Sequence, residues 1–197
     1  MLTWSVGCAP DSTAQMPLPP PPGPGGGSTP FFMDGINQPP MPLAEEVELA
    51  DEAPVVGVVV GNEARAYVIQ EMSDTDCHVV NDVVEGVPIS MTYCDYTDRA
   101  RVLTRASGSE LIDLGLGGWL NGEMSVRLDG RMYQQTSEDI PLDDHPYERM
   151  AWSEWKAKHP ETRVFVGKKP KRAAPAAVQE PAAPGDDAES SAETPAG

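Results

Sequence analysis

The 197-residue chain carries 31 acidic and 14 basic side chains, which give a net charge of −17 at pH 7, and 40% of its residues are hydrophobic. This length and composition fit one ordinary globular domain with flanking segments. A field this negative repels phosphate backbones, so nucleic acid is not an expected partner. The apolar residues never approach the ~18 consecutive positions of a membrane-spanning helix, so no transmembrane segment is expected.

Proline divides the chain into three parts. Of the 21 prolines, 11 lie in the first 43 residues and five in the last 30. The run Pro17–Pro30 is poor in apolar residues, and the C-terminal end is rich in Ala, Pro, Glu and Ser, so neither segment can offset the entropy of ordering. We therefore expect a disordered Pro/Gly-rich leader (1–35), a globular domain (36–167) and a disordered tail (168–197).

The N-terminus leaves the compartment open. Ser5-Val6-Gly7-Cys8 resembles the small-residue end of a bacterial lipoprotein signal, in which Cys8 would carry the lipid. A signal peptide needs a basic region and ~7–15 apolar residues, whereas only seven residues, none of them basic, precede Cys8. Either the start is misplaced and the protein is exported and anchored to the cell envelope, or the match is a coincidence and the protein is cytoplasmic.

The folded part is predicted to be mainly β, a single antiparallel, hairpin-rich domain with one C-terminal helix. Short β-branched runs joined by turn dipeptides predict three hairpins: 55–60 with 64–69, 79–84 with 87–93, and 124–128 with 131–134. The third turn, Asp129-Gly130, fits type I′ geometry. The spacing of Trp152 and Trp155 predicts a helix over Tyr147–Lys158 with both rings in the core, followed by a strand over Thr162–Val166.

Two neighbourhoods hold side chains that could carry chemistry. In the first, strand alternation places His78 and Asp82 on one face and Cys77 and Asn81 on the other. The second begins at Cys94, where an apolar strand enters a polar loop. If the hairpin closes at residues 85–86, positions whose numbers add up to about 171 face each other. That register sets Cys77 and His78 opposite Cys94 and Tyr93, with Asp95 and Asp98 close by.

Five segments carry a resemblance to a known family: Val56–Tyr67, Val79–Pro88, Thr92–Cys94, Asp129–Gly130 and Trp152–Thr162. In this order, over about residues 36–167, the chain resembles the bacterial and archaeal domain of unknown function family 3179. The family has no established activity, so the resemblance implies a fold and domain boundaries rather than a mechanism.

The chain departs from the family pattern at both neighbourhoods. The family commonly reads His-Glu-Ile-Val-Asn-Asp, which sets its histidine at Cys77. It also commonly reads Tyr-Cys-Pro-Leu-Cys-Gly, which sets its second cysteine at Thr97. A Cys-x-x-Cys pair is therefore absent here, although Cys77 could supply the missing sulfur from across the hairpin.

Three classes of function remain open. Cys77, His78 and Cys94 could bind zinc or copper, because thiolate and imidazole suit those ions. The same neighbourhood could hold an enzyme site, with Cys94 as nucleophile, His78 as base and Asp82 or Asn81 as the orienting group. Against both stands the alternative that the cysteines are small buried hydrophobes or a cross-hairpin disulfide.

The third class is a recognition module, structural or binding a protein or small molecule. Trp119 and a flexible Gly115–Gly118 turn could form its contact patch. Arg65, Asn81, Tyr93 and Asp95 are the candidate ligand-binding residues. Arg65 in particular is expected either to be partly buried against Asp82 or Asp95, or to contact an anionic ligand, because charges within a sheet are retained when paired. The oligomeric state stays open.

Overall fold

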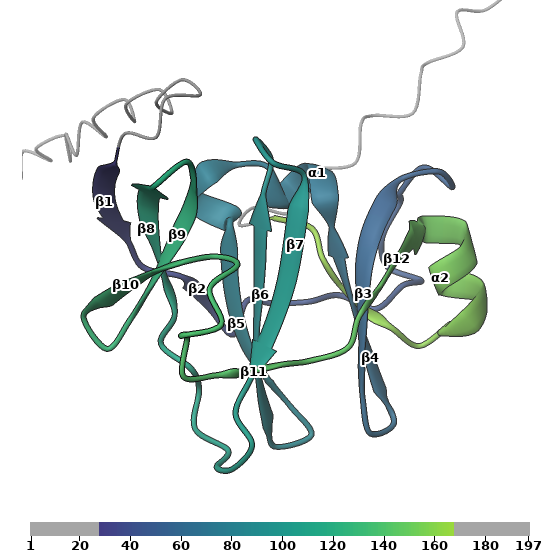
Figure 1. The fold of residues 1–197 in the computed structure, drawn as a ribbon. Coiled ribbons are helices and arrows are strands. Elements are labelled where there is room, and N and C mark those ends of the chain that lie inside the picture. Colours follow the sequence, from purple (N-terminus) through teal and green to yellow (C-terminus); the bar gives the residue numbers. More distant parts are fainter. Residues whose placement is uncertain (1–27, 168–197) are drawn as a thin grey trace, which may run out of the picture.

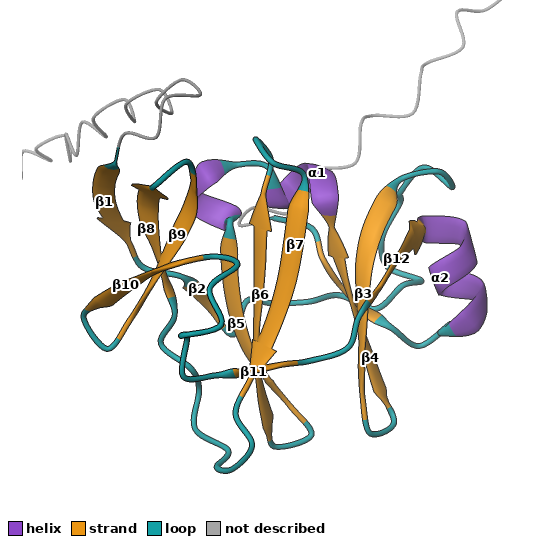
Figure 2. Cartoon of the chain, viewed as in Figure 1, coloured by secondary structure: helices purple, strands orange, loops and turns teal. Residues whose placement is uncertain are grey.

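The computed structural model describes residues 28–167 and shows a mainly β fold of three sheets (Figures 1 and 2). Sheet A has the order β1 (Thr29–Met33), β8 (Gly115–Leu120), β9 (Glu123–Leu128), β10 (Arg131–Gln134). Sheet B has the order β11 (Asp143–Asp144), β7 (Arg99–Thr104), β6 (Val87–Cys94), β5 (Val79–Val84), β2 (Ile36–Asn37). Sheet C has the order β12 (Glu148–Ala151), β3 (Pro54–Val60), β4 (Glu63–Val68), β13 (Arg163–Phe165).

Three short helical segments complete the described part. They are α1 (Ile69–Met72), the 3-10 helix η1 (Thr75–Cys77) and α2 (Trp152–Lys158). Figure 1 shows the three sheets side by side with sheet B in the middle and α2 beyond sheet C. No helix of residues 28–167 has the length and apolar character needed to cross a membrane.

Three hydrophobic clusters fill the layers between these elements. Between sheets B and C, Val80, Ile89 and Met91 pack with residues of β3 and β4 such as Val58 and Tyr67. A second cluster joins the opposite face of sheet B to sheet A, and a third joins the outer face of sheet C to α2. The central strands β5 and β6 are thus covered on both faces, which explains why nearly all of their residues are buried or half-buried.

The predicted hairpins are confirmed, with β5 and β10 at the expected bounds. Asp129 and Gly130 have φ values of 50° and 76°, and Glu85 and Gly86 have 47° and 79°. Positive φ at both central residues is what a type I′ turn requires, and its twist matches that of the strands. Short-range turn chemistry therefore sets the register of these pairs.

The predicted helix over Tyr147–Lys158 is only half correct. Residues Glu148–Ala151 form β12, which pairs antiparallel with β3, and α2 begins at Trp152. The edge of β3 offers these residues backbone partners, and such pairing outweighs a helical pattern of side chains. Trp152 and Trp155 are buried against sheet C, as expected.

The predicted turn at Gly115–Gly118 is wrong, because these residues belong to the buried strand β8. A methyl group on Gly117 would lie 2.8 Å from Ser125 Oγ and 3.3 Å from Met132 Cε. The side chains of these two neighbours therefore occupy the space beside the glycine, which has no side chain of its own. Trp119 is only 8% exposed and packs edge-on against Tyr96. The proposed contact patch on Trp119 therefore lies largely in the core.

Gly57 offers a test of the packing of α2 on sheet C. A Cβ atom at this position would lie 2.2–2.4 Å from three carbons of the Trp155 ring. Gly57→Ala should lower the free energy of unfolding by roughly 1–3 kcal/mol, because the indole has no room to move aside. Urea unfolding measures this change. The control is Val59→Ala, at a 40% exposed position of the same strand; an equal loss there would contradict the packing argument.

Candidate functional site

The β5–β6 hairpin has the register that the sequence predicted. Val79 pairs with Thr92, and one residue further the Tyr93 amide donates to the His78 carbonyl at 2.9 Å. His78 therefore lies opposite Tyr93. The two polar neighbourhoods meet at this end of sheet B, next to the β6–β7 turn.

The two cysteines at this end pack on opposite faces of sheet B. Cys94 lies with Val79 in the cluster that joins sheets A and B. Cys77 lies with Val80 in the cluster between sheets B and C, and its Sγ is 3.6 Å from Asp76 Oδ1. The predicted face of Cys77 is wrong because the residue lies in η1, where strand alternation does not apply. Both are buried thiols, as the packing alternative expects.

His78 is held by two acceptors. Its Nδ1 lies 2.8 Å from the Met72 carbonyl oxygen and its Nε2 lies 3.2 Å from Asp95 Oδ1. Both contacts are hydrogen bonds only when both ring nitrogens carry protons. The ring thus links the end of α1 to the β6–β7 turn. Within the described part of the chain, no hydrogen bond joins His78 to Cys94, the base and the nucleophile of the enzyme hypothesis.

The described residues contain no group of three or more His, Cys, Asp or Glu side chains placed to hold a metal ion. Cys77 and Cys94 pack in different clusters, and His78 directs one nitrogen to a backbone carbonyl and the other to Asp95. A zinc or copper site on Cys77, His78 and Cys94 finds no support in this arrangement.

The β6–β7 turn is braced a second time by Asp98. Its Oδ1 accepts a hydrogen bond from Tyr93 Oη at 2.8 Å and pairs with Arg149 of β12 at 2.6 Å. The Arg149 guanidinium and the Tyr93 hydroxyl lower the pKa of Asp98. Burial and the bond to Asp98 raise the pKa of Tyr93 to about 12. The β6–β7 turn is thus held by polar contacts from sheets B and C.

Asn81, a predicted ligand-binding residue, is fully buried. Its Nδ2 donates to Asn37 Oδ1 at 2.8 Å and to the Leu114 carbonyl at 2.9 Å, and its Oδ1 accepts from Ser90 Oγ at 2.7 Å. These bonds join β2 and the segment before β8 to the centre of sheet B. The side chain of Asn81 is therefore used within the fold.

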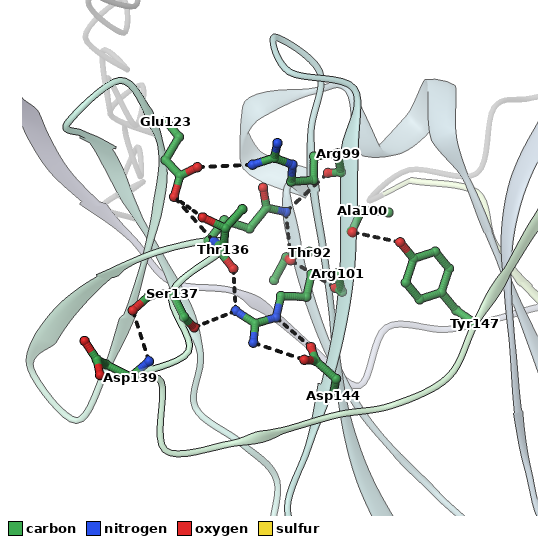
Figure 3. A network of polar contacts seen from close by, with 11 residues as sticks. Thr92, Arg99, Ala100, Arg101, Glu123, Thr136, Ser137, Asp139, Asp144 and Tyr147 are labelled. Carbon is green, nitrogen blue, oxygen red and sulfur yellow. Dashed lines mark hydrogen bonds and ion pairs between the residues drawn. The ribbon is translucent and has the colours of Figure 1, made fainter. Parts of the chain in front are cut away.

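The sequence did not predict the polar network in Figure 3, in which Arg101 of β7 is hydrogen-bonded to the segment that follows β10. Its guanidinium contacts Asp144 with two nitrogens, at 2.6 and 3.3 Å, and donates to the carbonyls of Gln135 and Ser137. Gln135 in turn donates to Thr92 Oγ1 at 3.0 Å. No local signal marks Arg101, because its partners lie more than 30 residues away and become neighbours only in the fold.

Arg65, the remaining predicted ligand-binding residue, sits between sheets C and B. Its Nε lies 3.2 Å from Asp82 Oδ2 and its Nη2 lies 2.7 Å from Glu63 Oε2, while Nη1 donates to the Ala64 carbonyl. The side chains of Arg65 and Asp82 are only 10% and 13% exposed. Three of the five N–H donors of the guanidinium are thus used, and two remain. Tyr67, whose hydroxyl is buried without a hydrogen-bond partner, lies two residues along the same face.

Arg163 lies directly beside Arg65. The parallel pairing of β13 with β4 sets Arg163 opposite Arg65 and Phe165 opposite Tyr67, and the rings of the second pair lie 6.4 Å apart. Two like charges at one register position disfavour the sheet. Arg163 Nη1 donates to the Met41 carbonyl at 3.2 Å, and within residues 28–167 no carboxylate pairs with it. Nothing in the sequence marked Arg163, because this pairing joins strands almost 100 residues apart.

Both arginines line an open cavity of about 600 Å³. Its walls come from residues 62–65, from residues 158–163 and from Leu43 and Glu45. This volume lies within the range of small-molecule sites. The cavity is therefore a candidate binding site distinct from the Cys94 neighbourhood.

The Asp98 brace predicts an acid-dependent loss of stability. Because the folded-state pKa of Asp98 lies below its ordinary value of 3.8, its contribution is present above pH 3.8 and is lost as the pH falls through the folded-state value. Asp98→Asn should therefore make the free energy of unfolding less dependent on pH in this acid range, as measured by urea unfolding at pH 7 and pH 3. Asp113→Asn, an exposed aspartate elsewhere, should retain the wild-type dependence; if both variants behave alike, the brace contributes nothing.

The burial of both thiols predicts low reactivity in the native state. In a Cys8→Ser background, Cys77 and Cys94 should react with an aromatic disulfide reagent only when urea unfolds the domain, since each residue is 2% exposed. The absorbance of the aromatic thiolate that the reagent releases measures the rate of reaction in the folded and in the unfolded protein. Rapid reaction of one thiol in the folded protein, lost in Cys94→Ser, would instead identify Cys94 as an accessible nucleophile.

Comparisons with known proteins agree with the resemblance noted in the sequence. No curated protein and no solved structure matches the chain. One family model, described as "Protein of unknown function (DUF3179)", matches residues 35–175. This match covers well over half of the chain, and the chain belongs to the DUF3179 family.

Proposed function

We propose that the domain is a binding module for a small ligand, and that the cavity over β4 and β13 holds an anionic group of this ligand between Arg65 and Arg163. The observation that carries the proposal is the register pair of two arginines at the wall of one cavity. Like charges side by side destabilise a sheet by themselves. A bound carboxylate or phosphate could accept hydrogen bonds from both guanidinium groups and reduce the repulsion between them.

The two arginines have different parts in this proposal. Arg65 is compensated by Asp82 and Glu63, so its contribution is geometric: a guanidinium fixed at three nitrogens directs its two remaining N–H donors. Arg163 has no acidic partner among the described residues, so it brings the uncompensated positive charge. A fixed donor beside a charged one suits a planar carboxylate or a phosphate.

The rim of the cavity adds two further basic side chains, His159 and Lys158. His159 packs against the Trp155 ring, with centroids 4.2 Å apart, and lines the cavity without a side-chain hydrogen bond to a described residue. Lys158 also lines it but pairs with Glu148 at 2.7 Å. The cavity thus offers one buried arginine, one exposed arginine and one imidazole to an incoming ligand.

The test uses Arg163→Gln, because Arg163 is exposed and its loss should leave the fold intact. Removing Arg65 instead would strand Asp82 between two sheets and destabilise the domain. Titration with succinate and with ε-aminocaproate, followed by amide chemical shifts, should perturb β4 and β13 in the wild type. In Arg163→Gln the affinity should fall at least about tenfold, as expected for a hydrogen bond to a charged group.

Arg131→Gln is the matched control, because it removes the same charge from β10, outside the cavity. It should leave both titrations unchanged. The proposal is overturned if neither compound perturbs β4 and β13, or if Arg163→Gln binds as the wild type does.

A further inference from the structure

We infer that the ligand of this cavity is a zwitterion, a molecule that carries a cationic group as well as the anionic group held by the arginines. This inference rests on the proposed function and names its ligand class. The observation behind it is that one cationic side chain, Arg163, and two anionic side chains, Glu161 and Glu45, line the same cavity.

The charges of the cavity differ from those of the rest of the domain. Over residues 44–167, 24 acidic and 10 basic side chains give a net charge of −14. The cavity wall instead has three of each sign: Arg65, Lys158 and Arg163 against Glu45, Glu63 and Glu161. The wall is therefore balanced within a strongly negative domain.

Some of these charges are already paired within the fold. Glu63 is bound to Arg65, and Lys158 is bound to Glu148 outside the wall. Arg163, Glu45 and Glu161 make no ion pair with any residue that the structure describes. One cation and two carboxylates thus face the same space without closing on each other.

Such separated charges complement a ligand with both signs. The carboxylate of the ligand would lie against Arg65 and Arg163, and its ammonium against Glu161 or Glu45. Long-range electrostatics favours the same class. The field of the domain repels a simple anion, whereas a zwitterion has no net charge and avoids this repulsion.

The experiment compares carboxylates that differ only in an amino group. Acetate, butyrate and caproate are titrated beside glycine, γ-aminobutyrate and ε-aminocaproate, and the amide shifts of β4 and β13 are followed. At least one amino compound should bind about tenfold more tightly than its partner without nitrogen, the gain of one additional charged hydrogen bond. The chain length that binds best reports the separation of the two charges.

Two variants separate this inference from the proposed function. The double variant Glu45→Gln, Glu161→Gln should abolish the advantage of the amino compounds and leave carboxylate binding unchanged or stronger. Glu48→Gln, an exposed glutamate of the same segment outside the cavity wall, should change nothing. If the plain carboxylates and the amino compounds bind equally, and Arg163→Gln loses this binding, the zwitterion inference is overturned and the anion site is retained. No binding of either series would overturn both.

Discussion

The burial of sheet B on both faces is the constraint on which the rest of the structure depends. Most side chains of β5 and β6 are buried or half-buried between the outer sheets, so their polar groups need partners within the protein. Asn81 meets this need through Asn37, Leu114 and Ser90, and Asp82 through Arg65. These bonds also join separate segments, so the polar residues of sheet B hold the layers in place.

The polar side chains around Cys94 also have structural partners. A cysteine, a histidine and two aspartates at the end of a hairpin suggest chemistry when read as a sequence. In the structure, each aspartate secures the β6–β7 turn: Asp95 contacts His78, and Asp98 contacts Tyr93 and Arg149. Arg163 differs from these residues, because no carboxylate of residues 28–167 pairs with its guanidinium, and this unpaired charge is the basis of the proposed ligand site.

Local signals determine how much of this the sequence could predict. Turn dipeptides and β-branched runs set β5, β6, β9 and β10, and they gave the correct register at His78 and Tyr93, because those pairs are neighbours along the chain. β8 was missed because its glycines read as a turn while the side chains of Ser125 and Met132 cover them. β12 was missed because its partner β3 lies about 90 residues earlier. Arg65 was recognised as a candidate from its charge in a strand, but Arg163 has no such signal.

The parallel pairing of β4 with β13 has a consequence for how the domain folds. Arg65 and Arg163 are 98 residues apart in the sequence, and a contact of this separation costs the entropy of closing the long intervening loop. A chain in which β13 has not yet paired with β4 therefore has Arg65 in place but lacks the side of the cavity wall that carries Arg163. A molecule that needs both arginines binds only the completed domain, and by mass action it shifts the folding equilibrium toward that state. For the ligand proposed above, binding would therefore report that β13 has paired with β4.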